Sequence, residues 1–357
     1  MRLVITSILI TLSVPAHAIT VFTAEEAAIL QQGLIATADE FILPAYQDQA
    51  TAAGRMNDAL SDYCAGAAGI EKAQAAFADT FLAWQRVSII NIGPIADAEG
   101  PMRVQMWPDP KGFARRAVRN AVRAADPGLL ENNALAGRTI ALTNLTALEQ
   151  LLYGDLQSAT YACDLAQSIA AFQTSIAREF VAQWTPGSAF RSSFDTAENG
   201  NERYPNVDTL VREMLAGAVV HVDRLRKFKL LRGLGDDENT GRPERTEARA
   251  SGLGLRSIEV SFRALGDFYN VPFGLFDLAP DIGGSTDGYL LSETAASVAD
   301  SLAVETSTLA QIVQAGGAPA DELRRYADLV LYQESFLKTG FPASIGLSAG
   351  FTAADGD

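Results

Sequence analysis

Apolar side chains recur every three or four residues along most of the chain, the spacing that places them on one face of an α-helix. The clearest apolar stripes occupy residues 73–87, 165–180 and 298–312. Strict alternation of apolar and polar residues between turn residues, which marks a strand, is missing from the sequence. The pattern therefore predicts an all-α protein. Further helices are expected near residues 24–63, 112–125, 135–154, 207–231, 249–269 and 319–338.

Three polar stretches rich in glycine, proline or charge interrupt the helices, at residues 186–206, 233–248 and 271–288. The first of them is the best candidate for a linker, because about four long helices are expected on each side of it. We therefore expect two packed helical bundles, one over residues 19–195 and the other over residues 196–357.

The first eighteen residues have the three regions of a secretory signal peptide. Arg2 supplies the positive charge, residues 3–14 are mostly apolar, and Ala16-His17-Ala18 is a typical cleavage pattern. The apolar run is shorter than the roughly 20 residues that span a bilayer, and no later run is long enough. No cysteine lies near the cleavage point to carry a lipid. We therefore expect an exported protein of the periplasm or cell envelope, with no transmembrane segment in the mature chain.

The charge balance limits the partners. The chain has 28 Lys and Arg against 43 Asp and Glu, a formal net charge of −15. Such a surface repels the phosphates of nucleic acids and disfavours anionic lipid headgroups, so we expect no nucleic-acid partner. The chain has only two histidines and two cysteines. This excludes zinc fingers, cysteine-ligated iron–sulfur clusters and any site that needs several imidazoles.

The two cysteines, Cys64 and Cys163, are expected to form a disulfide, because an exported chain folds in an oxidising compartment. The alternative is a pair of separate buried thiols. A bridge would close a loop of about 100 residues, which the chain-entropy estimate values at about 4 to 5 kcal/mol.

The segment 93–111 is the most distinctive loop. Each residue before a proline is held extended, so the Gly93-Pro94 and Trp107-Pro108-Asp109-Pro110 steps make the loop stiff. A stiff loop holds Arg103, Trp107 and Asp109 in a fixed relation, which suits a binding site. Alternatively, Trp107 plugs the end of a bundle while Arg103 and Asp109 pair for structural reasons. The spacing does not decide between the two.

A second candidate lies in the helix near residues 143–154. Thr146 and Glu149 are three residues apart and so share a helix face. Glu149 borders an apolar stripe of leucines, where a carboxylate is either solvated or part of a site that faces a cavity. Thr-x-x-Glu also matches a capping box, which is a purely structural device.

Four features in matching order resemble the imelysin-like family of exported bacterial proteins linked to iron uptake, some of which are described as metallopeptidases. These are the Trp-Pro-Asp loop after Gly93-Pro94, the helix that ends in LEQLLYG at Gly154, the later Arg256-Ser257 helix and the terminal residues 350–357. The resemblance extends over residues 25–357. It implies two packed helical bundles with a candidate site between them.

The family's G-x-H-x-x-E motif is altered in this chain. Asn144 stands at the place of the glycine and Thr146 at the place of the histidine, while Glu149 is retained. A neutral hydroxyl is a poor ligand for zinc or iron compared with an imidazole. His221 is the only histidine beyond the signal peptide, and we expect it to be structural. A metallopeptidase with an altered site would require His221 beside Glu149.

The remaining candidates suit hard cations or anions. Glu149 and Asp109 are candidate ligands for iron or another divalent or trivalent cation. Arg103 and Arg256 indicate an anionic group, although both arginines could instead pair with the two carboxylates in a buried network. The other candidate ligand-binding residues are Trp107, Asn144, Thr146 and Ser257.

These observations predict an exported protein that binds a metal ion, a metal chelate or another small anionic ligand between the two bundles. The setting in iron uptake comes from the resemblance alone. The alternatives are the metallopeptidase with an altered site and a non-catalytic scaffold that binds another envelope protein.

Overall fold

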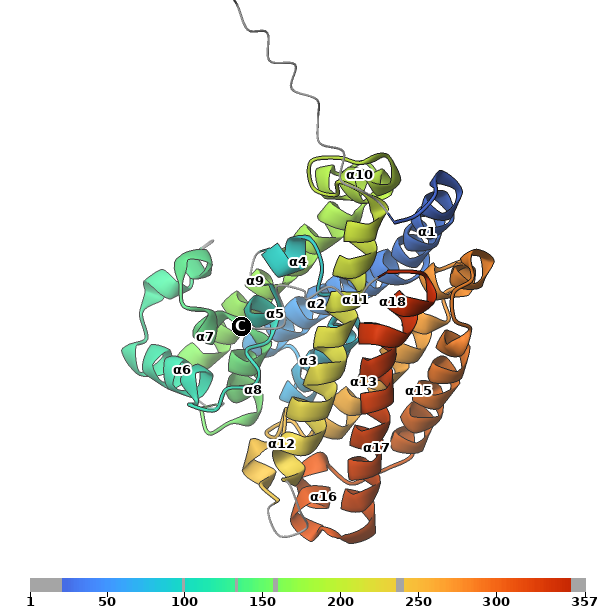
Figure 1. The fold of residues 1–357 in the computed structure, drawn as a ribbon. Helices are drawn as coiled ribbons and strands as arrows, with labels where there is room; N and C mark the ends of the chain where they lie inside the picture. The colour runs from blue at the N-terminus through green and yellow to red at the C-terminus, as the bar shows by residue number, and fades with distance from the viewer. Residues whose placement is uncertain (1–20, 98–99, 132–133, 157–159, 236–240, 348–357) are drawn as a thin grey trace, which may run out of the picture.

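The structure is a computed structural model that describes residues 21–97, 100–131, 134–156, 160–235 and 241–347 (Figure 1). No strand is found in these ranges, and the predicted all-α class is confirmed. None of the helices in the described part of the chain is long and apolar enough to cross a membrane. The predicted signal peptide and the terminal residues 350–357 lie outside the described residues.

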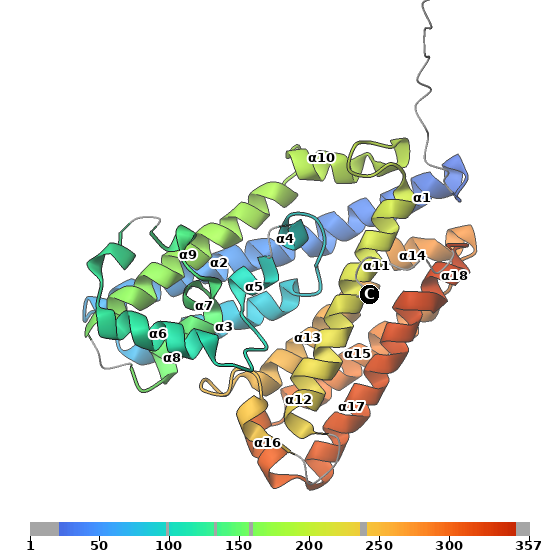
Figure 2. The same ribbon diagram turned by 60° about the vertical axis from the view of Figure 1, so that its left-hand side comes forward.

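One group of helices comes from the N-terminal half of the chain (Figures 1 and 2). Its long members are α2, α3 and α9, and α2 packs against both of the others. The stripe predicted at residues 73–87 is the buried face of α3, with Phe77 and Trp84 inside the core. The helices of this group are α2 (Leu43–Cys64), α3 (Ile70–Val87), α4 (Pro94–Asp97), α5 (Gly100–Val104), α6 (Phe113–Ala124), α7 (Ile140–Thr143), α8 (Leu145–Tyr153), α9 (Thr160–Trp184) and the 3₁₀ turns η2 (Pro127–Leu129) and η3 (Ala134–Gly137).

A second group comes from the C-terminal half, where α13 packs along α15 and where α17 contacts α11 and the π-helical segment η5. The two groups meet where α3 contacts α13. The elements of this group are α11 (Val207–Asp223), η5 (Arg224–Leu230), α12 (Leu231–Leu234), η6 (Pro243–Arg245), α13 (Gly254–Tyr269), α14 (Leu275–Leu278), η7 (Ala279–Ile282), α15 (Asp287–Ala303), α16 (Leu309–Ala315), α17 (Gly317–Ser335), η8 (Phe336–Gly340) and α18 (Phe341–Ser344). The connection between the groups carries α10 (Ala189–Asp195) and η4 (Ala197–Asn199).

The first helix belongs to both groups. α1 (Ala24–Thr37) continues without a break through the π-helical segment η1 (Ala38–Ile42) into α2. Whereas α2 packs within the N-terminal group, α1 packs on α14, η7 and α11 from the C-terminal half. Gly33 allows this contact, because a Cβ atom there would lie 3.0 Å from the Cα of Leu275. One continuous helix therefore ties the two groups together (Figure 2).

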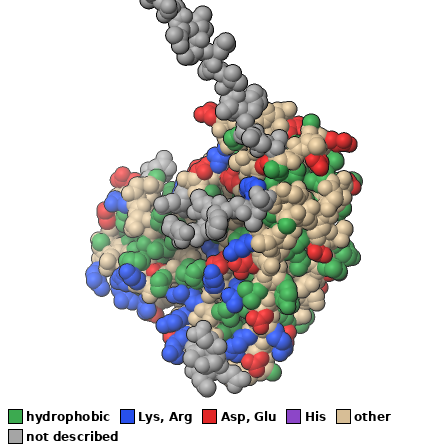
Figure 3. Space-filling view, in the orientation of Figure 1, with side chains coloured by type: hydrophobic (Ala, Val, Ile, Leu, Met, Phe, Trp, Pro, Cys, Tyr) green, Lys and Arg blue, Asp and Glu red, His purple; other side chains and the backbone are tan. Residues whose placement is uncertain are grey.

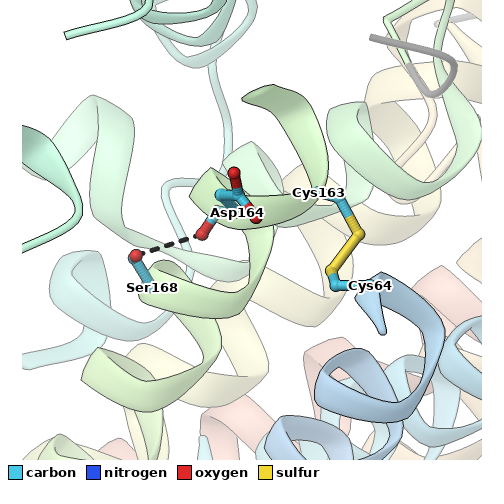
Figure 4. Close-up of a disulfide and its surroundings, with 4 residues drawn as sticks. All are labelled: Cys64, Cys163, Asp164 and Ser168. Atoms are coloured by element: carbon cyan, nitrogen blue, oxygen red, sulfur yellow. Dashed lines mark hydrogen bonds between the residues drawn. A yellow bond between two sulfur atoms is a disulfide. The ribbon is translucent and has the colours of Figure 1, made fainter. Parts of the chain in front are cut away.

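The predicted disulfide is confirmed. Cys64, the last residue of α2, is bonded to Cys163 on α9, and the two Cα atoms are 5.6 Å apart (Figure 4). The bond links residues 99 positions apart in the sequence and fastens one end of the packed α2–α9 pair.

Candidate functional site

A buried polar cluster lies where the two bundles meet. Its centre is the ion pair between Lys229 on η5 and Glu247 in the loop before α13, with 3.0 Å between Nζ and Oε2. The Nζ of Lys229 also donates to Gln85 of α3 and to the fully buried Ser257 of α13. Gln105 Nε2 donates to Glu247 Oε1 at 2.7 Å. Each polar group therefore has partners, and the cluster joins both bundles.

The π-helical segment η5 explains how two cations of one helix reach this interface. In an α-helix, side chains five residues apart point about 140° away from one another. In a π-helix the i→i+5 hydrogen bond places such residues one turn apart. Arg224 and Lys229 are five residues apart within η5, and both line the same small cavity.

Two hydrogen-bond donors at this cavity lack partners among the described residues. The Nε1 of Trp107 is buried and has no hydrogen-bond partner there. The guanidinium of Arg224 forms no hydrogen bond or ion pair with the described residues, and burial lowers its pKa, while the nearby charge of Glu247 opposes this shift. The cavity has a volume of about 20 Å³, which is room for about one water molecule or one ligand oxygen.

Arg224 also lines a larger, open pocket of about 480 Å³. The other lining residues come from the segment before Trp107, from the start of α6 and from α7, so the pocket lies where η5 meets the N-terminal group. Arg224 is the only charged residue among the described ones that line it. The pocket therefore combines an apolar wall with one guanidinium. Its other lining residues are Pro101, Met102, Met106, Phe113, Thr139, Ile140 and Ala141.

His221 lies beside the cluster in a fully buried position. Its Nδ1 is 3.3 Å from Ser88 Oγ, and its Nε2 is 3.3 Å from the carbonyl oxygen of Ser261. Burial, helped by the positive charges of Lys229 and Arg224, lowers the pKa of His221 to about 3. The imidazole is therefore neutral at pH 7, and both ring nitrogens face groups of the protein itself.

Glu149 of α8 is buried against the other bundle. Its Oε1 accepts hydrogen bonds from Ser251 N (2.8 Å) and from Ser251 Oγ (2.7 Å). Burial raises the pKa of this carboxyl group, and the charge of Glu247 raises it further, whereas the bonds from Ser251 oppose the shift. Asn144 caps the start of α8, since its Oδ1 accepts a hydrogen bond from the backbone N–H of Thr146.

A comparison with protein-family models matches residues 42–329 of the chain to the family described as imelysin. The chain belongs to the imelysin family. No curated protein matches the chain.

Two solved structures share the imelysin-like fold. An imelysin-like protein from Psychrobacter arcticum has a TM-score of 0.72 and 16% identity, with 92% of this chain and 98% of that chain covered. A "putative iron-regulated protein A precursor" from Parabacteroides distasonis has a TM-score of 0.72 and 13% identity, with 88% of this chain and 95% of that chain covered. The predicted membership and the predicted fold are both confirmed.

Several residues predicted for the site have other contacts in this imelysin-family chain. Arg103 lies 3.6 Å from Glu179, and Arg256 lies 3.0 Å from Glu259. Asp109 accepts hydrogen bonds from the first two backbone N–H groups of α6 and so caps that helix. No group of three or more His, Cys, Asp or Glu in the described part of the chain is arranged to hold a metal ion.

Other predicted residues do lie at the interface of the two bundles. Trp107 and Ser257 belong to the cavity and the cluster, and Glu149 contacts Ser251. Thr146, one of the predicted ligand-binding residues, donates its hydroxyl to the carbonyl oxygen of Met106 at 3.2 Å. The stiff loop predicted from its prolines thus reaches the interface of the bundles.

The sequence reasoning missed Arg224, Lys229 and Glu247. Lys229 had a usable signal, because it lies four residues after Leu225, on the apolar stripe of its helix, where a cation must find a buried partner. Glu247 had none, since it belongs to a charged loop that looks solvated. Arg224 could not be assigned without the π-helical geometry.

Proposed function

We propose that this imelysin-family protein binds a small anionic ligand, or a metal ion held in an anionic chelate, in the pocket beside Arg224. The observation that carries the proposal is the guanidinium of Arg224, which lines both the pocket and the small cavity without a carboxylate partner among the described residues.

A desolvated guanidinium without a hydrogen-bonded partner is costly even with the charge of Glu247 nearby, so a ligand that supplies an anionic oxygen would gain from filling this position. Guanidinium binds carboxylate and phosphate groups through two parallel hydrogen bonds. The free N–H of Trp107 offers a further donor to the same ligand. The side chains of Met102, Met106 and Ile140 favour a ligand with an apolar part.

The proposed metal, iron or another divalent or trivalent cation, would arrive with ligands of its own. The two carboxylates predicted to bind it, Glu149 and Asp109, already accept hydrogen bonds from protein N–H groups. This supports a chelate rather than a bare ion. The name of the Parabacteroides relative refers to iron regulation of that protein. Together with the predicted signal peptide, it supports a role in iron uptake in the periplasm or cell envelope.

The contacts of the metallopeptidase candidates favour this binding function over the alternative. A peptidase site would need the imidazole of His221 beside the carboxylate of Glu149. His221 instead faces Ser88 and Ser261, and Glu149 accepts from Ser251.

Titration of the mature protein with citrate, ferric citrate and inorganic phosphate, followed by calorimetry and by tryptophan fluorescence, tests the proposal. We expect at least one probe to bind, and Arg224→Gln to weaken that binding at least tenfold, which corresponds to about 1.4 kcal/mol. Arg55→Gln is the matched control, because Arg55 is exposed on α2, away from the pocket lining.

Thermal unfolding of both variants checks that the fold is retained. The proposal is wrong if no probe binds, or if a folded Arg224→Gln protein binds as tightly as the original. Titration of the original protein and of Glu149→Ala with uncomplexed Fe³⁺ and Ca²⁺ tests the alternative that a metal ion binds directly at Glu149. Binding of a bare ion that is lost only in Glu149→Ala would replace the chelate with a metal site at the altered motif.

A further inference from the structure

Helix α6 carries a row of exposed arginines. Arg115, Arg119 and Arg123 follow one another at intervals of four residues, and Arg116 lies beside them; all four are exposed. Only Arg115 has an acidic partner among the described residues, Asp155, at 3.6 Å between two exposed side chains.

Three more exposed arginines lie in the loop before α13. Arg242, Arg245 and Arg249 form no ion pair with the described residues. This loop packs on α12, where the backbone N–H of Arg242 donates to Gly233 O at 2.7 Å. We call the seven arginines of the two segments the basic face: Arg115, Arg116, Arg119, Arg123, Arg242, Arg245 and Arg249. In Figure 3 the Lys and Arg side chains gather over α6 and around α12.

Basic side chains outside these segments are mostly paired. Arg203 lies 2.8 Å from Asp97, Arg263 lies 3.1 Å from Asp300, and other pairs involve Lys72, Arg86, Arg191, Arg324 and Lys338. In a chain with a net charge of −15, acidic partners are abundant. Six of the seven arginines of the basic face have no acidic partner among the described residues, and this concentration is a specific feature of the protein.

The row on α6 has a cost that packing does not explain. Like charges four residues apart on a helix destabilise it. The apolar side of α6, with Val118 and Ala121, is already buried in the core, and among these arginines only Arg116 has a described ring contact, with Phe113. Their guanidinium groups suit carboxylates, to which each can donate two hydrogen bonds.

We propose that the basic face is a docking surface for an acidic segment of a partner protein. The pocket lined by Phe113 and Arg224 lies next to α6 and η5, so the face is indented rather than flat. A protruding chain segment can follow such a surface, whereas a planar bilayer would touch only its rim. Phe113 is 43% exposed beneath the guanidinium of Arg116 and offers an apolar contact to the same segment.

Fluorescence anisotropy of a labelled peptide of eight glutamates, titrated with the mature protein at low salt, tests this surface. We expect Arg119→Gln/Arg123→Gln to raise the dissociation constant at least fivefold. The control Arg55→Gln/Arg178→Gln removes the same number of charges, at exposed positions of α2 and α9. We expect it to change the dissociation constant less than twofold. Added salt should weaken the binding, because the contacts are charged and exposed.

Sedimentation with phosphatidylglycerol vesicles provides the second measurement. The proposal is overturned if the protein binds these vesicles but not the peptide, if it binds neither, or if both double variants lose the same affinity. Arg224→Gln should bind the peptide with nearly the original affinity, since Arg224 is not one of the seven arginines of the basic face. Failure of ligand binding in the pocket and failure of docking at the basic face are therefore distinguished.

Discussion

Glu149 and Ser251 are joined across the interface of the two bundles, with Oε1 of Glu149 lying 2.8 Å from the backbone nitrogen and 2.7 Å from the hydroxyl of Ser251. Glu149 is one of the two carboxylates that the sequence predicts as metal ligands. In the structure its carboxyl group has a structural task, which is to accept hydrogen bonds from the backbone N–H and the hydroxyl of Ser251. The hydroxyl also has a second acceptor, the carbonyl oxygen of Ala248 at 3.1 Å.

Substitutions of Glu149 should separate its charge from its hydrogen bonds. Glu149→Gln keeps an oxygen for Ser251 and removes the repulsion from Glu247, so we expect a change of less than about 1 kcal/mol in the free energy of unfolding. Glu149→Ala leaves the backbone N–H of Ser251 without its acceptor and should cost about 1–3 kcal/mol. Urea unfolding at pH 7 measures both. Equal losses of unfolding free energy in the two variants would show that the hydrogen bonds to Ser251 do not account for the contribution of Glu149 to stability.

The pH dependence of stability should report His221. Its pKa is about 3 in the folded protein and near 6.5 when exposed, so the unfolded chain takes up a proton first as the pH falls. The contribution of His221 therefore declines below about pH 6.5, by at most about 1.4 kcal/mol per pH unit, until the folded protein is protonated near pH 3.

Urea unfolding of the original protein and of His221→Gln, at pH values from 7 to 4, tests this dependence. Carboxyl groups such as Glu149 titrate in both proteins, so the difference between the two curves isolates the imidazole. The free energy of unfolding of the original protein minus that of His221→Gln should decrease as the pH falls, because only the original protein loses the contribution of the neutral imidazole. A constant difference from pH 7 to 4 would contradict the assignment.

The disulfide between Cys64 and Cys163 should contribute strongly to stability, because it closes a loop of about 100 residues in the unfolded chain. Cys64→Ser/Cys163→Ser is expected to lower the free energy of unfolding by about 2–5 kcal/mol. Reduction of the original protein by dithiothreitol should have a similar effect and leave the double variant unchanged. If reduction destabilises the double variant as well, the loss has another cause.

The pair of Lys229 and Glu247 gives a further prediction. Lys229→Met leaves the Glu247 carboxylate buried without its cation, which should cost about 3–5 kcal/mol. Lys229→Met/Glu247→Leu removes both charges and should recover part of this loss. A double-mutant cycle by urea unfolding measures the coupling. If the loss of unfolding free energy in the double variant equals the sum of the losses in the two single variants, the ion pair itself does not contribute to stability.

The helices were predictable because their apolar stripes follow a period that only a helix satisfies. The stripe at residues 73–87 became the buried face of α3, and the stripe at residues 165–180 lies in α9. The proline-rich loop could likewise be singled out, since X-Pro steps restrict its backbone, and its Trp107 reaches the interface of the bundles.

The composition of the site was not predictable in the same way. The π-helical segment that turns Arg224 and Lys229 to one side was not singled out, because the apolar pattern over residues 207–231 predicts a regular α-helix, in which residues five apart point in different directions. The burial of Glu247 depends on Lys229, Gln85 and Gln105, which come from distant parts of the chain. Such contacts follow from the packing of the two bundles and not from local spacing.

The continuous helix from α1 into α2 has a consequence for the order in which the protein folds. The hydroxyl of Thr37 accepts a hydrogen bond from the backbone N–H of Leu275, which lies 238 residues later in the sequence. At a synthesis rate of about 5–20 residues per second, roughly 10–50 seconds separate these two residues on the ribosome. During that interval α2 gains α3 and α9 to pack against, while α1 gains α11 but still lacks α14 and η7. The first helix of the described chain is therefore among the last to be fully packed.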